Sequence, residues 1–354
     1  MAWSATALTG KHQDPSFPTK IYPIEIGSAW QFLTAHEMFD LVREDLLSVE
    51  RAIGIESAGS FDTLAPISKC LQQEGGERLR AALLLLCAQL AGGGDSRMAI
   101  QLGAVVEMMH AAALVHGDVI DVRQSCRGWA SGSLLSANGT CVLAGDWLYL
   151  GAFRVALQES VFHLVIGAAQ MMTMGQLNQI NRIGCIEMTE ADCIELADRN
   201  TACLFSVCGK LAAVTAGIEA QDGEKLSEFA WNVGMAFQLV DDLMDFVSSE
   251  STPAKHAGAN LKAGKVKMPL VYALEEASVS ERNLVASVLQ DRGSDAASFA
   301  NVLTLVDRSD GIQRTRARAR QFAGRARQIL AEFPDSAYRR ALFTLIDRVT
   351  ERGW

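Results

Sequence analysis

Residues 108–121, "MMHAAALVHGDVID", join an apolar run to two carboxylates, Asp118 and Asp121. Residues 237–246, "FQLVDDLMDF", repeat this arrangement with three aspartates. Residues three and four apart share one face of a helix, so Asp118 and Asp121 point the same way, as do Asp241 and Asp245. Carboxylates on an apolar helix are costly to bury unless a cation neutralises them. Two such faces opposed across a helical bundle would hold Mg²⁺ ions and, through them, a diphosphate. The alternative is that these are helix-end aspartates paired with surface arginines.

The bulk composition limits the class of protein. The chain has 354 residues, of which 49% are hydrophobic, so a sizeable core is expected and wholesale disorder is excluded. The net charge of −9 argues against a nucleic-acid partner, because there is no basic surplus to neutralise phosphates. A phosphorylated substrate remains compatible with this charge, provided that divalent cations supply the positive charge.

Cysteine usage and hydropathy bear on the compartment. The eight cysteines are scattered and form no Cys-x-x-Cys pair, which favours reduced, mostly buried thiols over a disulfide framework or a zinc site. The N-terminus lacks a basic region followed by an apolar stretch, so no secretory signal is expected. The apolar run at residues 81–93, "AALLLLCAQLAGG", is too short to span a bilayer. We therefore expect a soluble, cytoplasmic protein without stable membrane insertion.

The first 36 residues differ from the rest of the chain. Residues 1–36 hold three of the seven prolines and read as an N-terminal extension, either disordered or lying on the surface. In residues 37–354 prolines are rare and apolar residues recur at three- and four-residue spacing. Several segments are apolar nearly all round, as expected of helices inside a large bundle. The sequence predicts one all-α domain over residues 37–354.

The helical pattern is interrupted at three places, and one segment is unusually basic. Loops are expected at residues 92–95, 128–132 and 248–264. The basic segment "RTRARARQFAGRARQ" suggests an RNA-binding helix at first sight. An apolar stripe instead favours the solvated face of a C-terminal helix. The residues of that stripe are Ile312, Ala319, Phe322 and Ile329.

Cationic residues accompany both acidic stretches. "GGERLR" at residues 75–80 offers two arginines, and "RQSCRG" at residues 123–128 follows the first stretch. "AGANLKAGKVKMPL" at residues 257–270 follows the second, with Lys255 just before it. Cations close to both clusters suit an anionic ligand held between metal and base, and phosphates are the natural candidate.

Taken in order, these segments resemble the trans-isoprenyl diphosphate synthases, or polyprenyl synthetases, from about residue 40 to the end. The matching segments, each with the family pattern it resembles, are "GGERLRA" (GGKRLRP), "HAAALVHGDVID" (a helix ending HDDxxD), "CRG" (RRG), "LAGDWL" (GDxL), "MGQLNQ" (GExxQ), "NTACLF" (KTAxLF), "FQLVDDLMD" (the second aspartate motif) and "GKVKMPL" (GKxTLPL). The resemblance implies a large all-α bundle of the isoprenoid synthase type with a central cavity.

The resemblance also implies a reaction and a set of site residues. Such enzymes condense an allylic prenyl diphosphate with isopentenyl diphosphate in isoprenoid biosynthesis, with Mg²⁺ bound at the two aspartate motifs. The implied metal ligands are Asp118, Asp121, Asp241, Asp242 and Asp245. The residues implied to hold the allylic diphosphate are Gln238, Lys255 and Lys265, and those for isopentenyl diphosphate are Arg80, His110 and Arg127. Of all these, Asp121, Asp241, Lys255 and Lys265 are implied to be catalytic. The resemblance further implies dimerisation, with a second copy or with a homologue.

Four positions depart from the family pattern. Gly117 replaces an aspartate that binds metal, and Glu77 replaces a lysine for isopentenyl diphosphate. Cys126 and Asn200 replace an arginine and a lysine for the allylic diphosphate. Each charged hydrogen bond lost to phosphate costs roughly 1.5–3 kcal/mol. Three interpretations remain open: a divergent prenyltransferase with Asp118 turned inward as a ligand, a class I terpene cyclase or diphosphate lyase, or a non-catalytic subunit that partners an active homologue.

The residues before the first acidic cluster bear on product length. In the family, aromatic side chains four and five positions before the first aspartate close the cavity floor. Here those positions hold Ala113 and Ala112, with Met109 one turn deeper. The hypothesis is an open tunnel and a product of twenty or more carbons; the alternative is that small residues only allow close helix packing. His116 can equally be a core histidine hydrogen-bonded to the backbone.

Overall fold

The structure is a computed structural model that describes most of the chain. The described residues are 33–57, 78–120, 134–246, 258–291 and 296–351. The chain separates into two units, Met1–Gln31 and Phe32–Trp354, and every helix below belongs to the second. Helix α1 begins at Ala35, so the predicted domain start at residue 37 falls inside a helix, and the division into extension and domain stays a prediction.

The described residues form helices and no strand, which confirms the predicted all-α fold. The helices of the first half are α1 (Ala35–Asp40), α2 (Arg43–Ser57), α4 (Leu79–Leu90), α5 (Ser96–Ile120), α6 (Leu134–Gln158) and α7 (Phe162–Asn181). The helices of the second half are α8 (Glu190–Ala197), the π-helix η3 (Asp198–Ala202), α9 (Cys203–Ala216), α10 (Ala220–Met244), α11 (Ala259–Lys262), α12 (Met268–Glu276), α13 (Val279–Gln290), α14 (Ala296–Arg308), α15 (Gly311–Ala331) and α16 (Ala337–Thr350).

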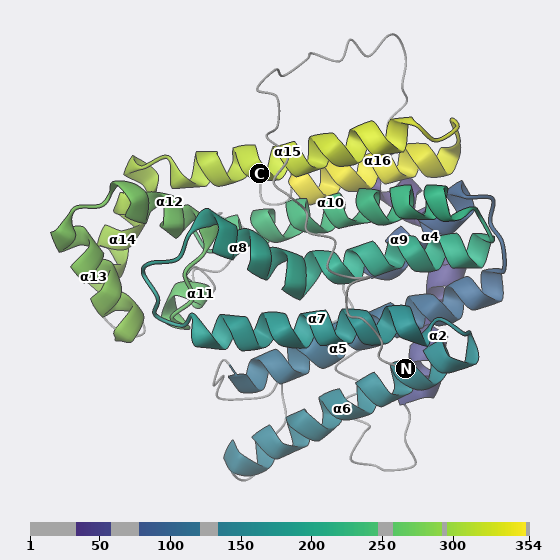
Figure 1. Ribbon diagram of the computed structural model, residues 1–354, viewed down its shortest axis with the longest axis horizontal. Coiled ribbons are helices and arrows are strands. Elements are labelled where there is room, and N and C mark those ends of the chain that lie inside the picture. The colour runs from purple at the N-terminus through teal and green to yellow at the C-terminus, as the bar shows by residue number, and fades with distance from the viewer. Residues whose placement is uncertain (1–32, 58–77, 121–133, 247–257, 292–295, 352–354) are drawn as a thin grey trace, which may run out of the picture. The chain divides into compact units, whose positions relative to one another are not determined.

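Helix α10 is at the centre of the packing. It lies against α9 and α15, and α5 packs on α4 and α6. Figure 1 shows α10 between α9 and α15, and α5 beside α6. Helix α4 is apolar nearly all round, and its residues 80–88 are buried, as predicted for a helix inside a bundle. Each fully buried leucine of this kind stabilises the fold by about 1.5–3 kcal/mol relative to an exposed one.

The predicted loops and the basic segment can be compared with the structure. Residues 92–95 form a loop, as expected, and the predicted loop at residues 128–132 lies outside the described residues. Of the predicted loop at residues 248–264, the described part begins at residue 258 and contains the short helix α11, so the prediction is wrong there. The arginines of α15 face outward and pair with acidic side chains, for example Arg314 with Glu275 and Arg325 with Glu228. Its apolar stripe packs inward, which confirms the interpretation as a solvated C-terminal helix.

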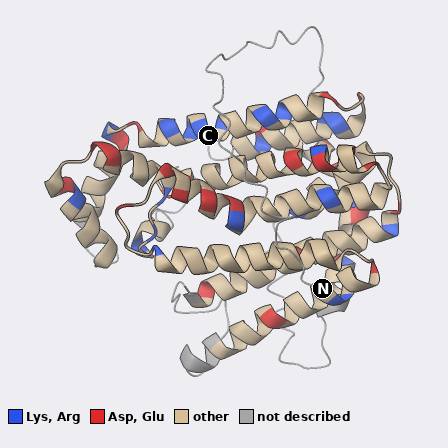
Figure 2. Cartoon of the chain, viewed as in Figure 1, with Lys and Arg blue, Asp and Glu red and all other residues tan. Residues whose placement is uncertain are grey.

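Charge is distributed unevenly over the helices. Figure 2 shows no charged residue along α7, in contrast to the basic residues along α15. Two helices in the described part of the chain are long and apolar enough to cross a membrane, at Ser96–Val119 and Gly139–Gln158. Both are longer than the apolar run at residues 81–93, which was judged too short to span a bilayer. Core helices of soluble proteins have the same length and composition, and 61% of the apolar window of the first is buried inside the bundle.

Among the cysteines that the structure describes, all but one agree with the sequence prediction. Cys87, Cys193, Cys203 and Cys208 are buried free thiols. Burial raises the pKa of the Cys193 thiol to about 12, so it remains protonated and unreactive. Cys141 is instead disulfide-bonded, so the expectation of reduced thiols is wrong at that position.

Candidate active site

A cavity of about 410 Å³ brings together many of the predicted site residues. Its wall includes side chains from α4, α5, α10 and the turn before α12, segments that are far apart in the sequence. The predicted residues on the wall are Arg80, His110, Gln238, Asp241, Asp242 and Lys265. Two of the substituted positions, Gly117 and Asn200, lie on the same wall.

Other predicted residues cannot be placed against this cavity. Asp121, Arg127, Lys255 and the substituted residues Glu77 and Cys126 lie outside the described residues. Asp118 and Asp245 are described, but neither is among the residues that line the cavity. The roles assigned to all of these residues by resemblance therefore stay predictions.

The second acidic cluster lies at the C-terminal end of α10. Asp241 and Asp242 are in its last turn, and Asp245 is the residue that caps it. The C-terminus of a helix carries the negative end of its dipole, so clustered carboxylates are unfavourable there unless cations are close. Lys265 and Lys267, on the turn before α12, line the same cavity and supply positive charge.

Asp242 is held by a short chain of hydrogen bonds. Thr201 Oγ1 donates to Gln238 Oε1 at 2.5 Å, and Gln238 Nε2 donates to Asp242 Oδ1 at 2.8 Å. The ammonium of Lys267 lies 2.8 Å from the same oxygen. Burial acts to lower the pKa of Lys267, but the charge of Asp242 outweighs it and raises the pKa above its usual range. These hydrogen bonds fix the orientation of the Gln238 side chain between Thr201 and Asp242, and the ion pair keeps Lys267 charged.

Asp245 serves the fold around the site. Its Oδ2 accepts a hydrogen bond from the Asn260 backbone N–H at 2.8 Å, and its carbonyl accepts one from the Gly258 N–H at 3.0 Å. Burial raises the pKa of Asp245, and the bond from Asn260 opposes this shift. The side chain thereby ties the end of α10 to the segment that carries α11 and Lys265.

The first acidic cluster presents a glycine to the cavity. Gly117 is on the wall, while Asp118 is 6% exposed and does not line the cavity. The structure therefore does not show Asp118 turned inward in place of the missing aspartate. A Cβ added at Gly117 meets no atom of the described residues within 4 Å, so a larger side chain fits among them.

His116 is a structural residue. Its Nε2 donates to the Val142 carbonyl at 3.1 Å and lies 3.3 Å from Asp146 Oδ1, both on α6. The ring lies so close to Gly145 that a Cβ there would be 2.2 Å from Nε2. The interpretation of His116 as a histidine hydrogen-bonded to the backbone is confirmed, and the "LAGDWL" glycine provides the space for its ring.

Arg80 lies on the cavity wall with its guanidinium over two aromatic rings. Its guanidinium lies 5.0 Å from the Phe205 ring centroid and 5.9 Å from that of Phe237. Burial lowers the pKa of Arg80, and the nearby Glu107 carboxylate acts in the opposite direction. Among the described residues its buried Nε has no hydrogen-bond partner, which is the state expected of a donor that awaits an anionic ligand.

Asn200 lies on the π-helix η3 and packs closely against α7. Its Nδ2 donates to Gln179 Oε1 at 3.0 Å, while its buried Oδ1 has no partner within the described part of the chain. A Cβ at Gly175 would lie 2.2 Å from that Oδ1, so the glycine of "MGQLNQ" permits this approach. π-Helical turns occur frequently at functional sites.

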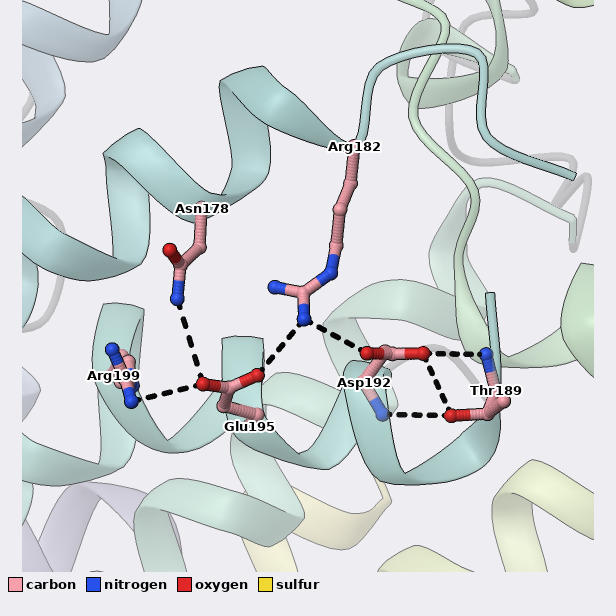
Figure 3. Close-up of polar contacts among 6 residues, drawn as sticks. All are labelled: Asn178, Arg182, Thr189, Asp192, Glu195 and Arg199. Carbon is pink, nitrogen blue, oxygen red and sulfur yellow. Dashed lines mark hydrogen bonds and ion pairs between the residues drawn. The ribbon is translucent and has the colours of Figure 1, made fainter. Parts of the chain in front are cut away.

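A further group at the rim was not anticipated from the sequence. Arg182 lines the cavity and donates to Asp192 at 2.8 Å and to Glu195 at 3.0 Å (Figure 3). Asp192 also forms a capping box with Thr189 at the start of α8, and Arg199 pairs with Glu195 at 2.9 Å. The network ties the end of α7 to α8 and positions η3. Because Asp192 and Glu195 neutralise the Arg182 guanidinium, we assign Arg182 a structural role and not a role in ligand binding.

An all-α bundle built around such a cavity defines the class of the protein, a helical synthase of the isoprenoid type. Comparisons with known proteins identify the family. Residues 62–306 match the family model described as polyprenyl synthetase. The chain belongs to this family, which confirms the resemblance seen in the sequence.

Relatives and solved structures agree with this assignment. The chain is 31% identical to the nonaprenyl diphosphate synthase of Mycobacterium tuberculosis over 316 residues, 88% of this chain and 93% of that protein. It is 28% identical to the octaprenyl diphosphate synthase of Haemophilus influenzae, covering 91% of this chain and 98% of that protein. The polyprenyl synthase of Caulobacter crescentus, solved in complex with calcium and isoprenyl diphosphate, superposes with a TM-score of 0.83 at 28% identity, over 92% of this chain and 99% of that one.

The donor atoms on the wall fit a hard divalent cation. Asp241 and Asp242 provide carboxylate oxygens, and Mg²⁺ is commonly held by one or two carboxylates together with substrate phosphates. No three His, Cys, Asp or Glu side chains gather into a metal site within the described ranges. Phosphate oxygens of the substrate would supply further ligands, as would Asp121, which lies outside those ranges.

Proposed function

We propose that this chain is a Mg²⁺-dependent trans-prenyltransferase that condenses an allylic prenyl diphosphate with isopentenyl diphosphate in the cytoplasm. The observation that carries the proposal is a single cavity lined both by an acidic and lysine-containing group on α10 and the turn before α12, and by Arg80 and His110. One group suits a metal-bound diphosphate, and the other suits a second diphosphate held by direct hydrogen bonds.

Each described residue has a definite task in this proposal. Asp241 and Asp242, with Asp118, Asp121 and Asp245 as further predicted ligands, would hold Mg²⁺. Bound Mg²⁺ would supply positive charge where the leaving diphosphate becomes more negative. Gln238, Lys265 and, outside the described residues, Lys255 would orient that diphosphate and stabilise the same charge. Arg80 and His110, with Arg127, would hold isopentenyl diphosphate so that its double bond faces the allylic carbon.

The apolar part of the wall would protect the reactive carbocation. Ala113, Met172, Leu196 and Phe237 line the cavity beside the polar groups. A wall of this kind excludes water, which would otherwise capture the cation before the second substrate does.

Product length depends on the floor of the cavity. Ala113 is on the wall, but Ala112 and Met109 are fully buried and do not line it. The small side chain at residue 113 supports a product of twenty or more carbons, as do the octaprenyl and nonaprenyl diphosphate synthases to which the chain is similar. Ala112, the other alanine expected at the cavity floor, is instead part of the helix packing.

We further propose that the chain dimerises with a second copy or a homologue through α6. Leu143, Leu150 and Leu157 are 70%, 62% and 67% exposed and recur at every seventh residue, so they share one face of that helix. An exposed apolar stripe of this length is typical of a protein interface. Sedimentation velocity should show a dimer that Leu150→Glu dissociates.

A second candidate function is a non-catalytic subunit. Gly117 favours it, because the wall lacks a carboxylate where the family pattern has one. A terpene cyclase or diphosphate lyase is the third candidate. It receives support only from Glu77, which lies outside the described residues.

One experiment separates the three functions. The purified protein is incubated with Mg²⁺ and allylic diphosphates of several lengths, with and without isopentenyl diphosphate, and the products are analysed by mass spectrometry. Elongated diphosphates are the expected result. Hydrocarbons or alcohols formed without isopentenyl diphosphate would instead indicate a cyclase or lyase. Absence of turnover, with activity appearing on addition of an active homologue, would indicate a non-catalytic subunit.

A further inference from the structure

Lys267 is a cavity residue outside the set of substrate-binding and metal-binding residues proposed above. It is the residue preceding α12, where it takes the N-cap position, and it lines the cavity with Asp241, Asp242 and Lys265. Its side chain is 19% exposed, and that of Asp242 is 5% exposed. The ammonium group and the carboxylate are 2.8 Å apart, a distance typical of a charge-assisted hydrogen bond.

The position of this pair is unusual for both charges. A lysine at a helix N-terminus and aspartates at a helix C-terminus each face the like-signed end of a helix dipole. Neither charge is therefore satisfied by its own helix. A buried ion pair of this kind is weak evidence for stability, since desolvation offsets the attraction. A role in ligand binding accounts better for its place on the cavity wall.

The pair also occupies an oxygen that a metal ion would use. Asp242 Oδ1 accepts hydrogen bonds from both Gln238 Nε2 and Lys267 Nζ, each at 2.8 Å. A divalent cation at this oxygen would compete with a fixed ammonium group. The carboxylate that can be approached more readily is that of Asp241, which is exposed at the cavity.

We propose that Lys267 takes the place of a divalent cation at Asp242, so that Asp242 binds the lysine while Asp241 remains the proposed metal ligand at this helix end, and that Lys267 contacts the diphosphate directly. Its ammonium group neutralises Asp242 and presents its remaining N–H bonds to a phosphate oxygen in the cavity. The inference rests on the proposed function, because it assumes that a diphosphate binds there. It deepens that function by assigning part of the cationic charge at this site to the chain itself. Diphosphate binding is then partly independent of Mg²⁺.

The test measures binding of inorganic pyrophosphate to the full chain by calorimetry, in EDTA and in Mg²⁺. The wild-type protein is expected to bind pyrophosphate in EDTA. Lys267→Gln keeps a donor for Asp242 but removes the charge, and should weaken binding in EDTA by about tenfold or more. In Mg²⁺ the difference in affinity between the two proteins should shrink, because in Lys267→Gln the ion can bind Asp242 in place of the missing ammonium group.

Two further variants control this measurement. Lys262→Gln removes an exposed lysine of α11 that does not line the cavity, and should bind pyrophosphate as the wild type does. Lys267→Arg keeps the charge and should retain binding in EDTA within about threefold. This variant also keeps the test decisive if Lys267→Gln does not fold, since the wild-type result in EDTA and the Lys267→Arg result do not depend on it.

Three results would overturn the inference. They are no pyrophosphate binding by the wild type in EDTA, equal binding by Lys267→Gln, or loss of binding in Lys267→Arg comparable to the loss in Lys267→Gln. None of these measurements requires turnover. A protein that binds pyrophosphate through Lys267 but makes no prenyl product would contradict the proposed function and leave this inference standing.

Discussion

The C-terminal ends of α5 and α10 both contribute to the cavity wall, but among the described residues only the end of α10 presents carboxylates to it. At the end of α10, Asp241 and Asp242 face the cavity, and Gln238 and Lys267 hold Asp242 in place. At the end of α5 the position on the wall is Gly117, which offers no ligand. One end is built as a binding site with its own hydrogen-bond network, whereas the described part of the other contributes mainly shape.

The neighbours of each helix end explain the difference. His116 donates a hydrogen bond to the Val142 carbonyl of α6, and its ring packs against Gly145. These contacts fix the end of α5 on α6. The end of α10 is fixed by Asp245, which holds the following segment through Asn260. Substitution at residue 117 therefore removes a ligand without disturbing the described fold, because no described residue packs against a Cβ at that position. A site of this family can lose chemistry at one helix end while both helices keep their places.

The largest effect is expected from the intact end. Asp241→Asn removes a carboxylate from the wall with little change in shape, and should lower kcat/KM for condensation by about 10³-fold. The matched control is Asp222→Asn in the first turn of the same helix, where Asp222 is exposed and pairs with Lys225 at 3.3 Å. Steady-state kinetics in Mg²⁺ measure both. A loss in Asp241→Asn no greater than tenfold would show that the α10 end is not the metal site.

The packing at the α5 end is tested by Gly145→Ala. The added methyl group would overlap the His116 ring, and overpacking of this kind costs about 1–3 kcal/mol of unfolding free energy. Gly139→Ala on the same helix meets no atom within 4 Å and should be neutral or stabilising by up to about 1 kcal/mol. Urea denaturation compares the two variants. Equal stability would mean that His116 does not fasten α5 to α6.

The end of α5 is tested by introducing an aspartate at Gly117, where the family pattern has one. Gly117→Asp places a carboxylate on the cavity wall without a clash, and should raise Mg²⁺-dependent turnover by about tenfold, equivalent to about 1.4 kcal/mol in the barrier. The control is Gly117→Asn, a neutral side chain of the same shape that should not give this rise. If turnover of Gly117→Asp is unchanged, the missing aspartate does not limit the enzyme.

The smallest change concerns the apolar wall between the two ends. Ala113→Phe places an aromatic ring in the cavity and should shorten the product, while Ala113→Ser should leave its length unchanged. Mass spectrometry of the reaction products gives the chain-length distribution. The same distribution in Ala113→Phe as in the wild type would show that the growing chain does not pass this residue.

Much of the fold and part of the site could be predicted from the sequence. Apolar spacing without alternation predicted the all-α bundle, since the period of hydrophobic residues directly reflects helical geometry. Motif order predicted which side chains meet, and Arg80, His110, Gln238, Asp241 and Lys265 do line one cavity. These residues are found in short, specific patterns, so their positions can be recognised without knowing how the helices pack.

The residues that were missed act through contacts between distant segments. Lys267 was predicted only to be one of several cations near the second acidic cluster, because its pairing with Asp242 depends on how the chain returns from α10 to α12. Arg182 was missed because its partners lie on α8, and periodicity does not say which helix end meets which. A signal for Lys267 did exist. Pro269 follows it closely, as at the start of a helix, which placed a lysine at a helix N-terminus and needed a nearby acid to explain it.

The π-helical segment η3 makes the spacing of the chain here as consequential as its side chains. A π turn holds one residue more than an α turn, and each residue of an α-helix rotates the chain by about 100°. Deleting one residue of η3 would let α8 and α9 merge into one regular helix, with the upstream half turned by that angle about its axis. In a mutational scan, a substitution of the half-buried Arg199 should therefore be tolerated better than any change in the length of this segment.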